Sequence, residues 1–284
     1  MKNTFFIGVT ILLLVIVVHF SFALNLLTKN EKRALGDLAD ALHYPWNWGL
    51  SEPNCDWLGV ICNDYGHVVN LALSRGQLSG SIPESIGGLY KLESFGIGVN
   101  NIQGPLPSSL ANITTLQFLL MDLNPLDATI PNAWSQFQSI RMINIASARL
   151  YGSIPPNLVK IPSLDTLILN SNNLQGKVPP VPKKKEFISL DFRNNTLSGS
   201  LPNDLSGVDI FNLSNNNLTG TIPQYICQLA MAPHTTEIWL QNNQWTCPLP
   251  DCCTSPLLNN IKCGGQCGYE KQQTEKRKPK IQIN

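Results

Sequence analysis

The eight cysteines of this 284-residue chain predict disulfide chemistry in an oxidising compartment. Cys55 and Cys62 stand seven positions apart, and we expect them to close a short loop as a disulfide with Trp57 packed beneath it. The other cysteines are Cys227, Cys247, Cys252, Cys253, Cys263 and Cys267. These six allow fifteen pairings. A zinc site built from the last four is the alternative, because thiolates are preferred zinc ligands.

Histidines and carboxylates, which could support acid–base catalysis, do not fall into a catalytic pattern. The four histidines are His19, His43, His67 and His234, scattered along the chain. No nucleophile–base spacing, phosphate-binding glycine loop or metal-ligand cluster accompanies them. Asp122 and Asp191 lie three copies apart in a repeat of about 24 residues that runs along the chain. At strand spacing this is about 14 Å, which exceeds the roughly 6.5–9.5 Å of an inverting glycosidase pair. We therefore expect no enzyme, no cofactor and no metal site.

The N-terminal residues 1–23 read as a signal peptide. Lys2 supplies the positive charge, an apolar run follows from Phe5 to Val18, and Ser21-Phe22-Ala23 fits a cleavage site. The run is shorter than the ~20 residues of a spanning helix, and no second apolar stretch follows. We expect a secreted protein of the extracellular space or cell wall, not an integral membrane protein. The net charge of +1 predicts no nucleic-acid partner.

A repeat of about 24 residues must position these side chains. Its eight copies fill residues 68–250 and begin at Val68, Leu92, Leu116, Ile140, Leu164, Phe187, Val208 and Thr235. Each copy follows L-x-x-L-x-L-x-x-N-x-L-x-G-x-I-P, the leucine-rich-repeat signature. We predict an α/β solenoid, a right-handed superhelix with a concave parallel β-sheet, short 3-10 or helical turns on the convex side and disulfide-bonded caps.

Asparagines after the strands are polar, but the repeat predicts a structural role for them. They are Asn100, Asn124, Asn172, Asn195, Asn216 and Asn243. A buried amide at this point can satisfy the backbone of adjacent coils, so a ladder should run along the stack. Gly76 and Ala148 replace the asparagine in two repeats, where the ladder should be weaker.

Both ends of the stack are predicted to be capped. Residues 24–67 form the N-terminal cap, in which the capping box Thr28–Glu31 starts a helix whose Leu35, Leu38 and Leu42 face the first repeat. Residues 251–268 form a cysteine-rich C-terminal cap, and stacking of successive coils favours Cys227 with Cys247. Residues 269–284 form a basic tail that we expect to be disordered.

The outward residues of the concave strands are the predicted ligand-binding surface. The candidates are Phe118, Leu120, Asp122, Leu123, Met142, Asn144, Thr166, Ile168, Asp191, Arg193 and Trp239. The apolar members could form an exposed patch over three repeats, and such patches mark interaction sites. A one-residue shift of frame would instead bury them, although Leu119 and Met121 already fill the inward positions.

Charged and aromatic residues elsewhere leave alternatives open. Asp191 and Arg193 could recognise a charged ligand, or pair with one another on the surface. Trp239 packs against the cap or stacks on a sugar or peptide. The lysines 183–185 are a solvated turn or an anion-binding patch.

Four sequons predict glycosylation, at Asn112, Asn194, Asn212 and Asn217. Asn112 falls on the convex side, where a glycan is harmless. Asn212 should face out from a concave strand, where a glycan would block the C-terminal third of the groove. Either Asn212 is unoccupied or the ligand avoids that third.

The cap C-x-W-x-G-V-x-C (Cys55–Cys62) together with repeats ending in L-x-G-x-I-P resembles the plant-type extracellular leucine-rich-repeat proteins. Those include receptor ectodomains and secreted polygalacturonase-inhibiting proteins. The resemblance covers about residues 26–253. The chain departs from the receptors in lacking a kinase, and from the inhibitors in having eight repeats where they have about ten, single cysteines in the first cap, and a different C-terminal cap.

The resemblance implies a secreted recognition protein that binds an extracellular protein or peptide, such as a receptor, on its concave face. An inhibitor of a cell-wall hydrolase is the second hypothesis. A cell-wall or matrix component that binds polysaccharide through its lysines is the third.

Overall fold

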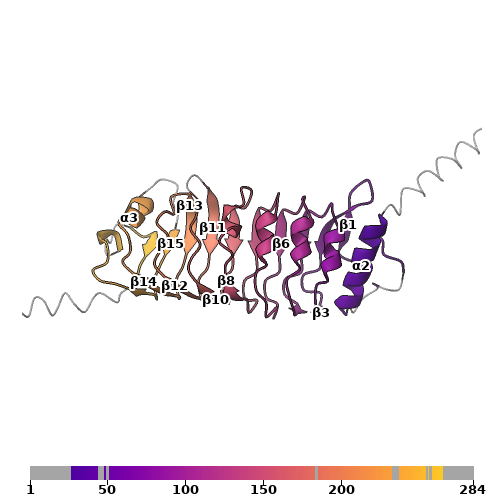
Figure 1. The fold of residues 1–284 in the computed structure, drawn as a ribbon, viewed down its shortest axis with the longest axis horizontal. Helices are drawn as coiled ribbons and strands as arrows, with labels where there is room; N and C mark the ends of the chain where they lie inside the picture. The colour runs from indigo at the N-terminus through magenta and orange to yellow at the C-terminus, as the bar shows by residue number, and fades with distance from the viewer. Residues whose placement is uncertain are drawn as a thin grey trace, which may run out of the picture.

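A curved stack of coils forms this protein in the computed structural model, which describes residues 27–43, 48, 51–182, 185–231, 237–253, 255 and 258–264. The predicted signal peptide and basic tail lie outside these residues, as do Lys183, Lys184 and Cys267. Figure 1 shows the stack running from helix α2 (Lys29–Ala41) at one end to helix α3 (Tyr225–Ala230) near the other. Within the described part, no helix has the length and apolar character needed to cross a membrane.

The main sheet has ten strands. In sheet order they are β1 (Val60–Cys62), β2 (Val68–Ala72), β4 (Ser94–Gly96), β6 (Phe118–Leu120), β7 (Met142–Asn144), β9 (Thr166–Ile168), β11 (Phe187–Asp191), β13 (Val208–Asn212), β15 (Glu237–Trp239) and β17 (Ile261–Lys262). All neighbours pair in parallel except β1, which is antiparallel to β2. Every predicted repeat start from 68 to 235 is followed by one parallel strand, and β17 adds a strand that the repeat pattern did not predict.

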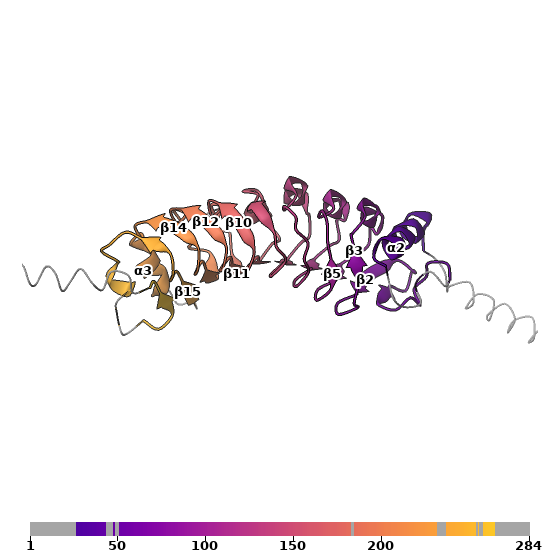
Figure 2. The ribbon, with the colours of Figure 1, turned by 90° about the horizontal axis from the view of Figure 1, so that it is seen from below.

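A second, interrupted sheet lies along one flank of the stack (Figure 2). Its strands are β3 (Ser79–Gly80) and β5 (Asn101–Ile102), then β8 (Tyr151–Ser153), β10 (Asn173–Gly176), β12 (Thr196–Gly199), β14 (Asn217–Gly220) and β16 (Gln244–Trp245). Glycines such as Gly104 and Gly152 hold a positive φ here, near 80–90°. Ala128 occupies the corresponding position of the third repeat, and it is absent from the positive-φ residues. The flank sheet breaks at this repeat because a residue with a Cβ avoids that conformation.

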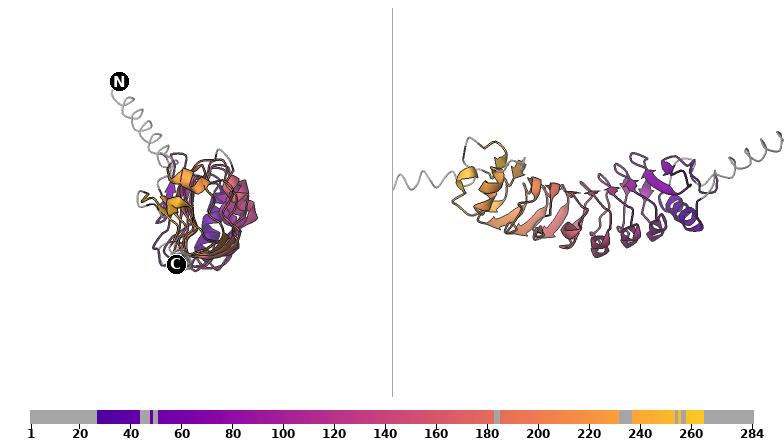
Figure 3. Two further views of the ribbon diagram at one scale, coloured as in Figure 1. Left: turned by 90° about the vertical axis from the view of Figure 1, so that its left-hand side faces the viewer. Right: turned by 90° about the horizontal axis from the view of Figure 1, so that it is seen from above.

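Short 3-10 helices cover the convex side, together with α3. They are η1 (Glu84–Gly88), η2 (Ser108–Asn112), η3 (Asn132–Gln136), η4 (Leu158–Lys160) and η5 (Asp251–Cys253). Figure 3 shows the resulting arc: helical turns lie on its outer side in the N-terminal half, and flank strands such as β10, β12 and β14 lie there in the C-terminal half. The inward leucines and isoleucines of all coils join in one continuous buried core.

The asparagine ladder is present as predicted. Asn124 illustrates it: its side-chain oxygen accepts from the Ile102 N–H at 3.0 Å, and its amide donates to Ile97 O and Met121 O at 2.9 and 3.2 Å. Where Ala148 replaces the asparagine, the Leu126 N–H donates to main-chain carbonyls instead. The ladder therefore uses the buried amides for backbone satisfaction and leaves none of them for a ligand.

The N-terminal end is closed by α2 and a disulfide. Thr28 and Glu31 form the predicted capping box, and the leucine stripe of α2 is buried. Cys55 and Cys62 are bonded, and Trp57 is buried and stacks on Trp48 with ring centroids 4.9 Å apart.

The predicted pairing of Cys227 with Cys247 is wrong. Cys227 bonds to Cys252, and Cys253 bonds to Cys263, while Cys247 is also disulfide-bonded. Cys227 lies in the convex helix α3, and the convex position one coil later belongs to Cys252 in η5, 25 residues on. These bonds rule out the zinc alternative, because Cys252, Cys253 and Cys263 have no free thiolate to offer.

Candidate functional site

The concave face is built from the outward residues of the main sheet. Strand register aligns them in rows that run across the strands. One row contains Ser94, Phe118, Met142, Thr166 and Ser189, and the next contains Gly96, Leu120, Asn144, Ile168 and Asp191. The alternation of inward and outward residues along each strand fixes which side chains can reach a ligand.

A central apolar patch occupies the middle of this face. We define it as Phe118, Leu120, Met142 and Ile168, all half-buried, from strands β6, β7 and β9. The inward neighbours of Phe118 and Leu120, Leu119 and Met121, are fully buried in the core. The predicted frame of these strands is therefore confirmed, and the one-residue shift that would bury the patch is wrong.

Two further candidates differ from the prediction. Thr166 is only 5% exposed and its hydroxyl donates to the Asp165 carboxylate at 2.9 Å, so the prediction that it presents a side chain to a ligand is wrong. Its neighbours Met142 and Ser189 lie on either side in register. Leu123 is 52% exposed, in the turn after β6 with a positive φ of 55°, so it lies at the edge of the patch.

Polar candidates surround the patch. Asn144 turns its side-chain oxygen back to its own strand, accepting from the Ala146 N–H at 3.2 Å. Asp122 lies against Gly98, where an added Cβ would stand 2.7 Å from the Asp122 Oδ1 atom. The glycine thus leaves the space that the Asp122 carboxylate fills.

Asp191 and Arg193 pair with one another, with Arg193 Nε 3.5 Å from Asp191 Oδ2. The Arg193 N–H also donates to Asp191 Oδ1 at 3.2 Å. Burial raises the pKa of the Asp191 carboxyl, and the backbone hydrogen bond and charge of Arg193 only partly oppose this shift. The two side chains therefore pair with one another on the surface, which favours the surface pair over a site for a charged ligand.

Trp239 marks the C-terminal end of the concave face. It is half-buried, and register places it between Asn212 on β13 and Lys262 on β17. Asn212 is 3% exposed, and its Oδ1 atom accepts from the N–H and the hydroxyl of Ser214. The prediction that Asn212 projects from the concave face is therefore wrong, since its neighbours cover it. Asn112, Asn194 and Asn217 are exposed.

The lysine turn is only partly described. The Lys185 ammonium donates to the carbonyls of Pro162 and Leu164 and lies 4.6 Å from the ring centroid of Phe187. Burial lowers the pKa of this ammonium. Lys185 thus ties two coils together. Its ammonium group is used for contacts within the protein and not for binding a ligand.

Sequence reasoning did not place Ile61 on this face. The antiparallel strand β1 puts Ile61 in register with Asn70, which extends the first outward row beyond the first repeat. Its side chain is 49% exposed. The alternation Val60, Ile61, Cys62, with Val60 buried, is the signal that could have identified it.

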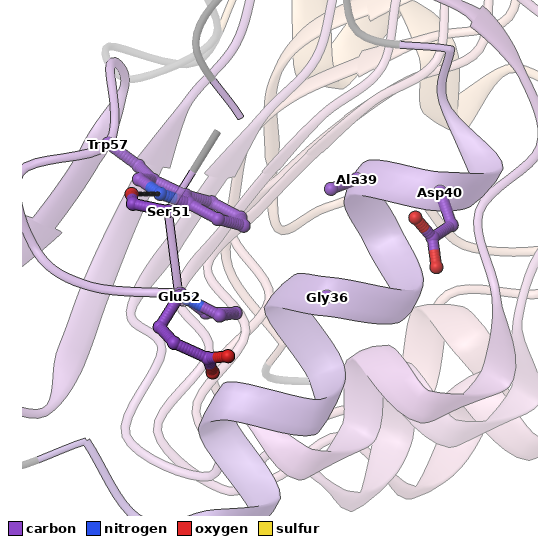
Figure 4. Close-up of a pocket in the computed structure, with 7 residues that line it drawn as sticks. Gly36, Ala39, Asp40, Ser51, Glu52 and Trp57 are labelled. Carbon is purple, nitrogen blue, oxygen red and sulfur yellow. Dashed lines mark hydrogen bonds between the residues drawn. The ribbon is translucent and has the colours of Figure 1, made fainter. Parts of the chain in front are cut away.

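The N-terminal cap contains an open cleft of about 420 Å³ between α2 and the loop before β1 (Figure 4). Its lining residues are Gly36, Ala39, Asp40, Ser51, Glu52, Pro53 and Trp57. The Trp57 indole N–H donates to the Ser51 hydroxyl at 3.2 Å. Asp40 and Glu52 are exposed carboxylates on opposite walls, so they remain hydrated.

Chemically, the concave face is equipped to bind. Asp122 follows β6 and Asp191 ends β11, and these two strands are three strand spacings apart. The described residues contain no group of three or more histidine, cysteine or acidic side chains that could hold a metal ion. Apolar contact, flanked by single charges, is what this surface offers a partner.

Comparison with known proteins agrees with the fold. Residues 131–244 match the family described as EGF-like domain-containing protein ComC LRR domain. In Arabidopsis thaliana, MDIS1-interacting receptor like kinase 1 is 40% identical over 68 residues, covering 23% of this chain and 7% of that protein. A probable leucine-rich repeat receptor-like protein kinase of the same plant is 34% identical over 111 residues, covering 35% and 10%.

Solved receptor ectodomains show the same arrangement. The ectodomain of GASSHO1/SCHENGEN3 from Arabidopsis thaliana, in complex with CASPARIAN STRIP INTEGRITY FACTOR 2, superposes with a TM-score of 0.66 at 28% identity, over 75% of this chain and 27% of that chain. Pollen Receptor Kinase 3 gives a TM-score of 0.54 at 28% identity, over 60% and 85%. The relatives are kinases only through regions outside the matched part, which is a non-catalytic repeat domain.

Proposed function

We propose that this chain, which carries a leucine-rich-repeat domain of the plant extracellular type, is a secreted recognition protein that binds an extracellular protein or peptide on its concave face. The observation that carries this proposal is the central apolar patch, where four large, half-buried side chains lie side by side on the inner sheet and keep some exposed surface. A soluble protein rarely gathers such side chains on one face without a partner.

The inner sheet supports this choice because it is long and regular. We infer eight repeats, from β2 to β15, between an N-terminal cap closed by Cys55–Cys62 and a C-terminal cap closed by Cys227–Cys252 and Cys253–Cys263. Nine parallel strands at about 4.8 Å spacing make a face long enough for a partner that spans several coils. The ectodomain of GASSHO1/SCHENGEN3, which this chain resembles, is in complex with CASPARIAN STRIP INTEGRITY FACTOR 2.

Binding with a variant in the patch tests the proposal. The wild-type protein, Leu120→Asp and a control, Tyr151→Asp, would each be used for affinity capture from the native extracellular fluid. Leu120 lies in the patch, whereas Tyr151 is 51% exposed on the flank strand β8. We expect wild type and Tyr151→Asp to capture the same protein or peptide in similar amounts. Leu120→Asp should capture at least tenfold less of it.

Folding of each variant would be checked by its melting temperature. Equal retention by wild type and a folded Leu120→Asp would contradict the proposal. Inhibition of a cell-wall hydrolase on mixing would support the second hypothesis instead, and salt-sensitive retention on acidic polysaccharide would support the third. The use of Lys185 as a tie between coils leaves the third hypothesis dependent on lysines other than Lys185.

A further inference from the structure

Ile61, in the N-terminal cap, gives the concave face an apolar side chain outside the central apolar patch. Strand register sets Ile61, Asn70, Ser94 and Phe118 in one row across β1, β2, β4 and β6. Ile61 and Phe118 are therefore separated by three strand spacings, about 14 Å. Both side chains have exposed surface, so this part of the row, from β1 to β6, has an apolar residue at each end.

The floor between these two side chains is made of small residues. Asn70 and Ser94, both half-buried, lie in the row itself, and the exposed Ala72 and the buried Gly96 lie in the row beside it. A Cβ on Gly96 would meet its nearest atoms at 3.6 Å, an ordinary contact, so packing of the protein itself does not demand a glycine. The accessible part of this floor, formed by Asn70, Ala72 and Ser94, carries only short side chains, so it can accept main chain and a small side chain of a ligand.

We infer that this part of the concave face binds an extended peptide segment with two apolar side chains four residues apart and a small side chain midway between them. The inference rests on the proposed function and names its ligand. An extended chain advances about 3.3 Å per residue, so residues i and i+4 stand about 13 Å apart, which matches the row. Positions i, i+2 and i+4 also point to one face: the first and last reach Ile61 and the central apolar patch, and the middle one meets the floor.

Charge around the floor adds a second feature of the ligand. Glu93 is exposed and directly precedes Ser94, and Asp122 stands two residues after Leu120. In the described part of the chain neither carboxylate forms an ion pair, whereas Asp165 and Asp191 each pair with an arginine. The two uncompensated negative charges favour a basic residue in the peptide between or beside its apolar side chains.

Selection from a random peptide library displayed on phage tests this inference with the full secreted chain as target. Enriched peptides would be synthesised, and their dissociation constants measured by fluorescence anisotropy. We expect apolar residues at i and i+4, a small residue at i+2 and an excess of lysine or arginine. Moving the second apolar residue to i+3 or i+5 should weaken binding at least tenfold.

Variants separate this inference from the proposed function. Ile61→Asp and Leu120→Asp should each weaken peptide binding at least tenfold, while Tyr151→Asp leaves it unchanged. Ile61→Thr keeps the β-branched side chain that suits a strand and removes apolar surface, so it repeats the test if Ile61→Asp does not fold. Peptides that need Leu120 but not Ile61 would overturn the two-point geometry and leave the proposed function standing. If every selected peptide binds wild type and Leu120→Asp equally well, both the two-point geometry and the proposed function are overturned.

A second copy of the chain is the other occupant that could cover Ile61. Size-exclusion chromatography with light scattering distinguishes it from a peptide. We expect wild type and Ile61→Asp to have the same mass. A wild-type dimer that Ile61→Asp converts to monomer would overturn the peptide assignment.

Discussion

At the scale of single residues, Asn212 shows how burial overrides a sequence motif. Its amide oxygen accepts from Ser214, which is the serine of its own sequon, and both side chains are buried. A glycan needs the amide nitrogen in solvent, so the folded chain has no room for it there. We expect glycopeptide mass spectrometry of the secreted protein to find Asn212 unmodified, with glycans confined to the exposed Asn112, Asn194 and Asn217. An occupied Asn212 would show that its strand is covered differently in the secreted protein.

Asp191 offers a second test at this scale, through the pH dependence of stability. Burial raises the pKa of its carboxyl above the usual value of 3.8, so ionisation costs folding free energy. This cost begins as the pH rises past the pKa of the unfolded carboxyl and is complete above the folded pKa. We expect Asp191→Asn to stabilise the protein slightly at pH 7, by less than about 1 kcal/mol, and to have no effect near pH 3.

Arg193→Gln is the matched control for this prediction. It removes the cation that favours the ionised carboxylate, so it should destabilise the protein at pH 7 and not near pH 3. Urea unfolding at the two pH values measures both variants. A stabilisation by Asp191→Asn that is equal at both pH values would contradict the electrostatic cause.

At the scale of elements, the asparagine ladder holds neighbouring coils together. Asn124→Ala leaves the Ile102 N–H and the Ile97 and Met121 carbonyls without their side-chain partner. Each buried polar group that is left without a hydrogen-bond partner costs about 1–3 kcal/mol of folding free energy. We expect a clear fall in the urea midpoint, whereas Asn101→Ala, at an exposed residue of β5, changes it little. Equal effects of the two variants would show that the ladder contributes little to stability.

The sequence predicts the elements well where the repeat is regular and poorly where it is not. The spacing of inward leucines locates each strand from β2 to β15, and Leu119 and Met121 fix the frame of the patch correctly. The pattern misses β17 because Ile261–Lys262 carries no L-x-L core, and it misses β1 because that strand runs antiparallel. Stacking of coils alone mispairs Cys227, because the repeat pattern does not show which side of the coil each cysteine occupies.

Candidate site residues were predictable by direction but not by depth. Alternation along a strand correctly directs Phe118 and Leu120 outward, yet it also directs Thr166 and Asn212 outward, where both are buried. Depth depends on the sizes of neighbouring side chains in adjacent coils and on local hydrogen bonds, such as that from Thr166 to Asp165. The packing contacts join residues about 20 or more positions apart, and the local hydrogen bonds depend on side-chain orientation, so the alternation along a single strand contains neither.

At the scale of the whole molecule, each coil contacts mainly its neighbours, so a change at one end should stay local. The Cys253–Cys263 bond ties η5 to the residue directly after β17, the strand that pairs with β15 at the C-terminal end. Replacing both cysteines by serine removes a cross-link of the kind worth about 2–5 kcal/mol. We expect hydrogen exchange to lose protection in β15 and β17, while β6 and β7, at the central apolar patch, keep theirs. Peptide binding at Leu120 should also be unchanged.

The opposite end supplies the matched control for this last prediction. Replacing Cys55 and Cys62 by serine should release β1 and β2, and leave β15 protected. Because Ile61 lies on β1 between these cysteines, the same variant should weaken the peptide that spans Ile61 and Phe118. Loss of protection that spreads from either end through β6 would contradict the local picture, because the stack would then unfold as one cooperative unit. In that case both double variants would weaken binding, and position along the solenoid would no longer separate stability from recognition.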